Sequence, residues 1–113
     1  MLIVDSVFGM RPEYDDHWDF RIWIEVPREL ALARGIERDA TLEGRDEAER
    51  LHRDRYHVAE QIYVTEVDPK AKADVIIDNT DCTHPVVIRW RPASYRLECR
   101  NAEVPIAQRP TAQ

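Results

Sequence analysis

The sequence predicts an α/β fold with parallel strands. Short apolar runs typical of buried parallel strands alternate with longer segments rich in helix-forming residues. Parallel neighbours need crossover connections, and helices between the strands supply them. The length of 113 residues, with 43% hydrophobic residues, suits one small domain. We therefore expect one α/β domain or part of one.

The first half of the chain begins with two strand candidates and a helix. Residues 2–4 are an all-apolar run that ends in Asp5, and residues 20–26 are β-branched and aromatic until Pro27 stops them. Residues 29–39 are good helix formers that follow a proline and an acidic residue, both favourable at a helix start. These segments predict a strand–helix unit.

The second half continues the alternation. Residues 41–44 interrupt the helical pattern, and residues 46–67 have apolar side chains at helical spacing, which predicts a longer helix. Residues 74–78 form a third short apolar run followed by turn formers, and residues 86–90 have the character of an edge strand. After residue 91 the periodicity is weak. There we expect a partly irregular tail that includes a marginal strand over residues 95–99.

Composition excludes several classes of protein. The net charge of −6 argues against a protein that binds nucleic acid of any base sequence, because such binding requires positive charge on the protein. Cys82 and Cys99 lack C-x-x-C spacing, which favours the reducing cytoplasm, and no apolar run is long enough to span a membrane. The histidines show no metal-ligand spacing and are expected to be ordinary surface residues: His17, His52, His57 and His84.

Asp5 is the first candidate for a functional side chain. It follows an apolar strand candidate, and ligands of open α/β sheets bind at the carboxyl ends of the strands. A carboxylate there can hold Mg²⁺ through water. It can equally be a strand-end aspartate that accepts loop N–H groups.

Three arginines form the second candidate group. Arg34 and Arg38 are four residues apart and share a helix face, and Arg45 follows the break in the helical pattern. Three guanidinium groups in one cleft would stabilise the charge of a transferring phosphoryl group. The alternative is a solvated helix on which these arginines pair with acids such as Glu37 and Asp39.

Taken together and in order, the motifs resemble the uridine kinase family of P-loop kinases. The similarity covers about residues 2–81 and includes a strand that ends in Glu-Val-Pro. The remaining motifs are Leu-Ile-Val-Asp-Ser-Val-Phe at 2–8, Arg-Gly-Ile-Glu-Arg-Asp at 34–39, Arg-Asp-Arg-Tyr at 53–56 and Ala-Asp-Val-Ile-Ile-Asp-Asn at 73–79.

The resemblance implies a partial P-loop NTPase-type three-layer fold whose first βα unit is missing. Residues 1–91 would be the C-terminal part of the kinase domain, with a lid at about 34–55, and residues 92–113 a tail. ATP and Mg²⁺ would be the cofactors of the complete domain, and a nucleoside its substrate. Ser6 replaces the glycine that usually follows the acid. The implied roles are catalytic for Arg34, Arg38 and Arg45, nucleotide-binding for Arg34, Arg38 and Asn79, and metal-binding through water for Asp5.

The phosphate-binding loop of that family is not in this sequence. The loop requires G-x-x-x-x-G-K-[ST], and neither Gly9, Gly35 nor Gly44 is followed by lysine. We therefore expect a truncated nucleoside phosphotransferase that is inactive as this chain alone, or a short non-catalytic interaction or regulatory module. Without the strand that carries the loop, residues 2–5 should either pair with residues 21–26 or splay away. Exposed strand edges could then pair with other chains or form a homo-oligomer.

Overall fold

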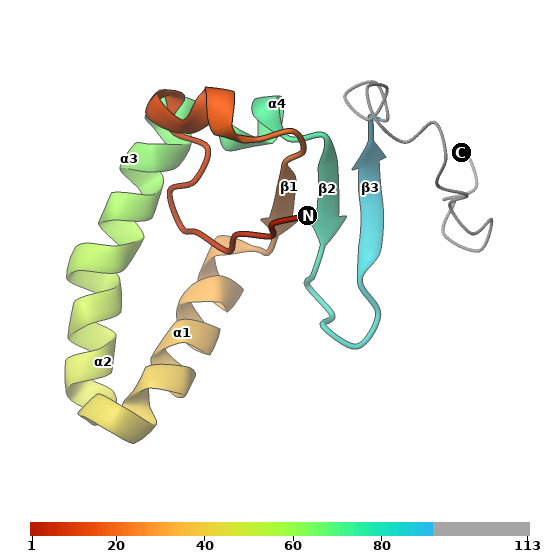
Figure 1. The fold of residues 1–113 in the computed structure, drawn as a ribbon. Helices are drawn as coiled ribbons and strands as arrows, with labels where there is room; N and C mark the ends of the chain where they lie inside the picture. The colour runs from red at the N-terminus through yellow and green to blue at the C-terminus, as the bar shows by residue number, and fades with distance from the viewer. Residues whose placement is uncertain (92–113) are drawn as a thin grey trace.

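The computed structural model describes residues 1–91, and the expectations for the tail from residue 92 lie outside the described residues. A small sheet stands beside a long helical hairpin (Figure 1). In chain order the elements are a 3₁₀-helix Pro12–His17, β1 Ile22–Glu25, α1 Arg28–Glu43, α2 Arg45–Leu51, a π-helical segment His52–Tyr56, α3 His57–Val67, α4 Pro69–Lys72, β2 Val75–Asp78 and β3 Val86–Trp90.

The three strands form one sheet in the order β1-β2-β3. β1 and β2 are parallel, with Ile22 opposite Val75, and the helices between them make the crossover connection. β3 is antiparallel to β2, so the expectation of parallel strands is correct for one pair and wrong for the other. The reason is the short connection over residues 79–85, which is long enough for a hairpin but not for a crossover.

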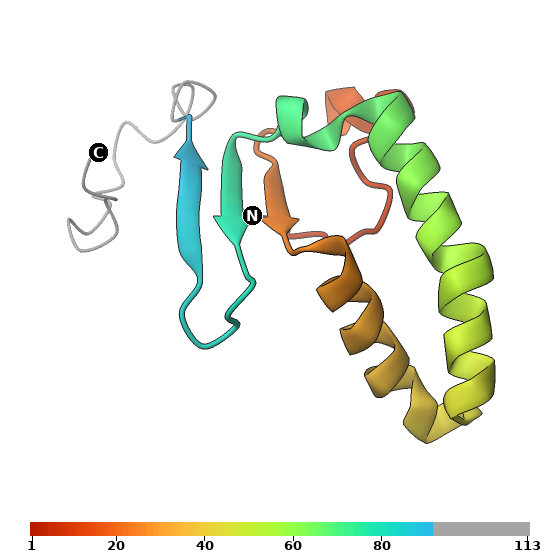
Figure 2. The ribbon, with the colours of Figure 1, turned by 180° about the vertical axis from the view of Figure 1, so that it is seen from behind.

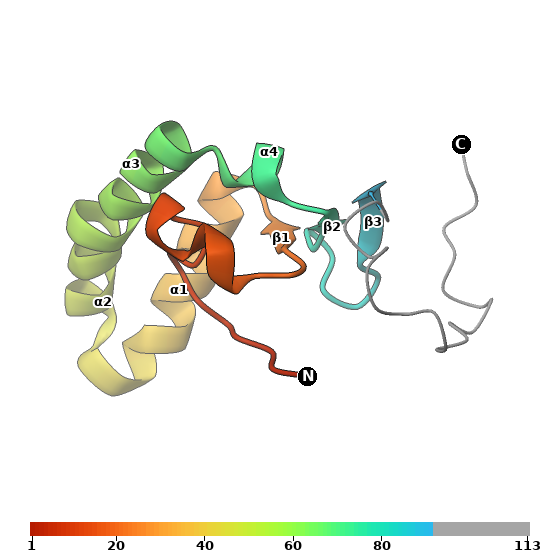
Figure 3. The same ribbon diagram turned by 45° about the horizontal axis from the view of Figure 1, so that its top comes forward.

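The first expected strand is absent. Residues 1–6 have no regular secondary structure, and the side chains of Leu2 and Ile3 are 84% and 80% exposed. This segment extends away from the sheet, as Figure 3 shows, so of the two expected outcomes the structure shows splaying and not pairing. An apolar run becomes a strand only when a neighbouring segment pairs with its backbone, and no segment within residues 1–91 pairs with this one.

The helical hairpin confirms both predicted helices and moves the break between them. α1 continues through residues 41–43 and ends at Gly44, whose φ of 84° suits the turn into α2. α2, the π-helical segment and α3 then return antiparallel to α1 (Figure 2). Leu32 and Ile36 of α1 pack against Ala48 of α2 to form the buried cluster of the hairpin.

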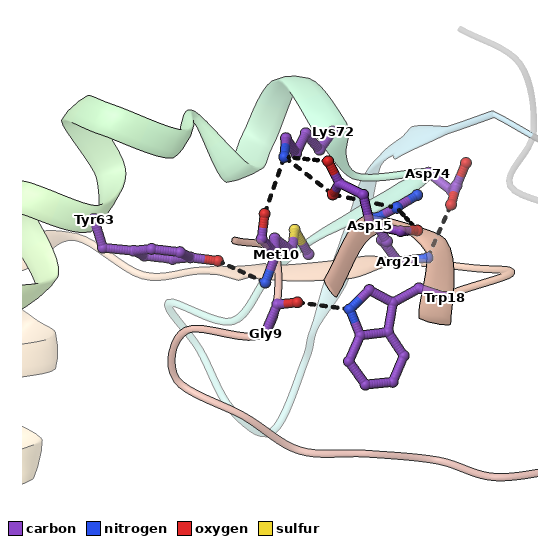
Figure 4. A network of polar contacts seen from close by, with 8 residues as sticks. All are labelled: Gly9, Met10, Asp15, Trp18, Arg21, Tyr63, Lys72 and Asp74. Atoms are coloured by element: carbon purple, nitrogen blue, oxygen red, sulfur yellow. Dashed lines mark hydrogen bonds and ion pairs between the residues drawn. The ribbon is translucent and has the colours of Figure 1, made fainter. Parts of the chain in front are cut away.

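A polar network attaches the N-terminal loop to the end of α3 and to α4 (Figure 4). The backbone N–H of Met10 donates to the Tyr63 hydroxyl at 3.1 Å, and Phe8 packs edge-on against the Tyr63 ring. Burial raises the pKa of the Tyr63 hydroxyl. Lys72 donates to the carbonyl of Met10 at 3.1 Å and to both carboxylate oxygens of Asp15 at 3.0 Å.

The same network joins this loop to the sheet. The backbone N–H of Arg21 donates to the Asp74 carboxylate at 2.8 Å, just before β1 and β2 begin. Its guanidinium group donates to the carbonyl of Asp15 at 2.8 Å, and Trp18 donates to the carbonyl of Gly9 at 2.6 Å. These contacts satisfy backbone groups, and those of Tyr63, Lys72 and Asp74 join residues that are 53 to 62 positions apart, so we assign the network a structural role. None of the helices within residues 1–91 is long and apolar enough to cross a membrane.

Candidate functional site

A groove lies between α1 and the returning arm of the hairpin. It has a volume of about 340 Å³, which falls within the roughly 300–1,000 Å³ typical of small-molecule sites. Its lining combines aliphatic, aromatic and charged side chains. The residues are Val7, Ala31, Leu32, Arg34, Gly35, Arg38, His52, Tyr56, His57 and Glu60.

The π-helical segment determines which side chains face the groove. The backbone N–H of His57 donates to the carbonyl of His52, an i→i+5 bond that closes a wider turn than an α-helix does. In an α-helix, residues five apart point in different directions, whereas this turn brings both histidines to the same groove. From their spacing of five residues we would expect His52 and His57 on different sides of a helix, and this expectation is wrong.

His52 is held tightly against α1. Its Nε2 lies 2.7 Å from the Asp39 carboxylate, and its side chain is only 12% exposed. Arg38 binds the same carboxylate at 2.8 Å, and the hydrogen bonds from Arg38 and then from His52 hold the pKa of Asp39 far below its usual range. The ring packs over Gly35, because a Cβ at that position would stand 2.5 Å from the ring. Asp39 thus joins α1 to the π-helical segment.

Arg34 reaches the carboxyl end of β2. Its guanidinium group donates to the carbonyl of Asn79 at 2.9 Å and to the carbonyl of Thr80 at 2.5 Å. Two of the predicted nucleotide-binding residues, Arg34 and Asn79, are therefore in contact, although the contact uses the backbone of Asn79. Because Arg38 lines the same groove, Arg34 and Arg38 are also brought together.

Arg45 and Asp5 lie elsewhere. Arg45 pairs with Glu37 at 2.7 Å across the turn at Gly44, is 64% exposed and does not line the groove. Asp5 is exposed in the unpaired N-terminal segment. Residues 1–91 contain no group of three histidine, cysteine, aspartate or glutamate side chains placed to hold a metal ion. Mg²⁺ is usually bound through one or two carboxylates together with waters and phosphate groups, and Asp5 does not line the groove that contains the two arginines.

The far end of the groove contains a second polar pair. Arg28, in the first turn of α1, donates to His57. Tyr56 stands edge-on to His52, with ring centroids 5.0 Å apart and planes at 83°, and is 49% exposed. Glu60 lies one helical turn further along α3 and also lines the groove.

Comparisons with protein-family models, with curated proteins and with solved structures find no significant match for this chain. The candidate site therefore rests on geometry. Sequence reasoning selected Arg34 and Arg38 but missed His52, Tyr56 and His57. The Arg-Asp-Arg-Tyr motif at 53–56 could have directed attention to this segment, because it includes Tyr56 and lies between the two histidines.

The groove contains hydrogen-bond donors of a kind that suits anions. Two guanidinium groups line it, and guanidinium donates hydrogen bonds in the planar geometry that phosphate and carboxylate accept. Glu60 is the one acidic lining residue, and Asp39 lies next to Arg38. An anion at Arg38 would therefore compete with, or share, the Asp39 contact.

Proposed function

We propose that this chain is the lid and sheet-edge part of a uridine-kinase-like phosphotransferase, and that its arginine groove binds the phosphate groups of a nucleotide. Because the sequence contains no G-x-x-x-x-G-K-[ST] loop, the proposal assigns binding to this chain and not phosphoryl transfer.

The observation that carries the proposal is the position of Arg34. Its side chain spans from α1 to the carbonyls of Asn79 and Thr80, immediately after β2, and it lines the same groove as Arg38. Ligands of open α/β sheets bind beyond the carboxyl ends of the strands. The Arg34 guanidinium at that edge is of the kind that recognises phosphate.

The strand arrangement gives further support. β1 pairs in parallel with β2, and α1 follows the carboxyl end of β1. The helices from α1 to α4 therefore form a crossover connection between two parallel strands. Among the described residues, β1 has a strand neighbour on one side only. A P-loop NTPase-type domain would place its phosphate-loop strand on the other side, and that three-layer arrangement is part of the proposal.

A binding titration tests the proposal directly. The ¹⁵N-labelled chain would be titrated with ATP and with pyrophosphate, and the shift of each amide resonance followed. We expect both anions to perturb groove residues and Arg38→Ala to weaken pyrophosphate binding about tenfold, as the loss of a charged hydrogen bond predicts. Arg50→Ala is the matched control, because Arg50 pairs with Glu47 on α2 and does not line the groove.

Two results would count against the proposal. Equal affinities of the Arg38→Ala and Arg50→Ala variants for pyrophosphate would show that Arg38 and its groove do not bind phosphate. Formation of uridine monophosphate by the isolated chain from uridine, ATP and Mg²⁺ would contradict the assignment of binding without transfer.

The alternative is a non-catalytic interaction module, which one observation favours. Ile22 and Ile24 of β1 are each 50% exposed, next to a strand edge with no neighbour among residues 1–91. Such an edge invites pairing with another chain. A homodimer in sedimentation velocity that Ile24→Lys abolishes would favour this alternative, and a monomer at all concentrations would oppose it.

A further inference from the structure

We infer that residues 2–5 pair with the free edge of β1 in a second copy of this chain, and that two copies exchange these segments reciprocally. The pairing is antiparallel, with Val4 opposite Ile22 and Asp5 opposite Arg21. This inference does not depend on phosphate binding by the groove. It rests on the interaction module described above as the alternative function, and it identifies the segment that the exposed edge accepts.

The free edge of β1 carries backbone groups that no strand within residues 1–91 binds. The carbonyl of Glu25 accepts a hydrogen bond from the Asn79 amide at 2.9 Å, so the backbone groups of Glu25 point towards β2. Backbone groups of successive residues in a strand point in alternate directions. Those of Ile22 and Ile24 therefore point to the free edge, where an added strand would bind them.

The N-terminal segment is a strand-forming sequence without a partner in its own chain. The side chains of Leu2, Ile3 and Val4 are exposed, and residues 1–6 have no regular secondary structure. The segment extends away from the sheet of its own chain (Figure 3). An apolar segment and an open strand edge are each stabilised by pairing, and a second copy supplies the missing part to both.

The antiparallel register places apolar side chains opposite one another. With Val4 opposite Ile22, Leu2 lies opposite Ile24, and each of these pairs exchanges both of its N–H···O bonds. Residues that lie opposite each other share one face of the sheet. Leu2 and Val4 then cover the side chains of the two isoleucines, which are each 50% exposed in the single chain.

Charge complementarity favours this orientation. Asp5 lies opposite Arg21 in a non-hydrogen-bonded pair, the type of pair in which opposite side chains are closer together. The guanidinium group of Arg21 contacts Asp15 through Nη2, but its Nε is buried and has no hydrogen-bond partner among the described residues. A second carboxylate at this position adds an opposite charge and an acceptor.

The parallel orientation has the opposite effect. With Leu2 opposite Ile22 in a parallel pair, Asp5 would lie beside Glu25. Lys70 already pairs with Glu25 at 2.8 Å, so two carboxylates would have to share one ammonium group. Like charges opposite each other on neighbouring strands are destabilising. The antiparallel orientation is therefore the one that we assign.

Reciprocal exchange limits the assembly to two copies. Within residues 1–91 each chain has one unpaired N-terminal segment and one free β1 edge, so two copies satisfy both. Once the first segment has paired, the second pairs within the same complex at a high effective concentration. A closed dimer with two-fold symmetry is the form expected.

A cross-linking experiment shows which residues lie opposite each other. In the full chain with Cys82 and Cys99 replaced by serine, a Val4→Cys protein is mixed with an Ile22→Cys protein and oxidised. We expect a disulfide between the two proteins, identified by peptide mass spectrometry, because opposite residues lie about 5.5 Å apart at Cα. Leu2→Cys mixed with Ile22→Cys is the matched control, because this pair is diagonal in the antiparallel register, at about 7–8 Å.

Sedimentation velocity measures the dimer in the unmodified chain and in three variants. Val4→Pro removes the N–H that donates to the Ile22 carbonyl of the second copy, so it should leave a monomer. Asp5→Lys should weaken dimerisation at least about tenfold, because two charge-assisted contacts per dimer are lost. Asp54→Lys makes the same charge change at an exposed position of the helical hairpin and should leave the dimer unchanged.

The variants of the N-terminal segment leave the folded monomer intact. Residues 1–6 have no regular secondary structure, and the side chains to be replaced are exposed in the single chain. Circular dichroism should therefore give the same Tm for Val4→Pro and Asp5→Lys at concentrations at which the unmodified chain is monomeric. A loss of dimer in these variants then reports the interface and not unfolding.

The outcomes distinguish this inference from the functions proposed above. A monomer at all concentrations refutes both the exchange and the interaction module, while phosphate binding by the groove is unaffected. A dimer that Ile24→Lys abolishes and Val4→Pro leaves intact keeps the interaction module and refutes the exchange. Absence of the Val4–Ile22 cross-link, or a cross-link in the control mixture instead, overturns the inference. A monomer with slow hydrogen exchange at the Leu2 and Val4 amides shows pairing within one chain and also overturns it.

Discussion

Replacement of Gly35 by alanine tests how closely His52 packs against α1. A Cβ at this position would lie 2.5 Å from Cε1 and 2.8 Å from Nδ1 of the His52 ring. The ring cannot move freely, because Asp39 holds it at 2.7 Å and Tyr56 contacts it edge-on. Gly35→Ala must therefore displace the ring or bend α1.

Two opposing terms set the magnitude. Overpacking typically costs about 1–3 kcal/mol, and alanine is favoured over glycine inside a helix by about 0.5–1 kcal/mol. We therefore expect Gly35→Ala to lower the free energy of unfolding by about 1 kcal/mol. In a His52→Ala background the clash is absent, so the same change should raise the free energy of unfolding by about 0.5–1 kcal/mol.

Urea unfolding followed by circular dichroism measures all four members of this double-mutant cycle. The reversal of sign between the two backgrounds is the distinctive result, because no change in helix propensity alone can produce it. If Gly35→Ala stabilises the wild-type chain as much as it stabilises the His52→Ala chain, the close contact between the imidazole and α1 is refuted.

Three further predictions concern other contacts. The pKa of Asp39 is depressed in the folded chain, so its stabilising contribution is fully present above the unfolded pKa of about 4 and is lost as the pH falls towards the folded pKa. The difference in Tm between wild type and Asp39→Asn should therefore shrink below about pH 4. A difference in Tm that does not change with pH would contradict the role of the carboxylate. Tyr63→Phe removes the acceptor of the Met10 N–H, which should cost about 1 kcal/mol and speed hydrogen exchange at that amide, whereas unchanged exchange would exclude the contact. Asp68 has a φ of 48°, so Asp68→Gly should raise Tm by relieving left-handed strain, and a lower Tm would show that the aspartate side chain compensates for it.

The sequence predicted the elements that form from local pattern. Two β-branched runs became β1 and β2, and their parallel pairing follows from the helices that separate them. The segments predicted as helices are helical, with α1 extended through residues 41–43. The predicted break covered residues 41–44. In the structure only Gly44 has a positive φ, so α1 continues to residue 43 and the break is a single residue.

The N-terminal run shows the limit of such patterns. Residues 2–4 are as apolar as β2, yet they are exposed while Val75 and Ile76 are buried. Strand formation depends on a partner that accepts backbone hydrogen bonds, and that partner is a property of the whole fold. Asp5 consequently does not lie at a sheet edge, and the sequence alone gave no indication of this.

The candidate site was partly predictable for the same reason. Arg34 and Arg38 share a helix face because residues four apart always do, so their common position follows from the sequence. His52 and His57 share the groove only because one turn of the returning helix is π-helical. Sequence by itself therefore determined the two parallel strands, the helical hairpin and the arginines of α1. The tertiary structure decided which strand found a partner and which side chains line the groove, because backbone pairing and helix packing are satisfied between segments far apart in the chain.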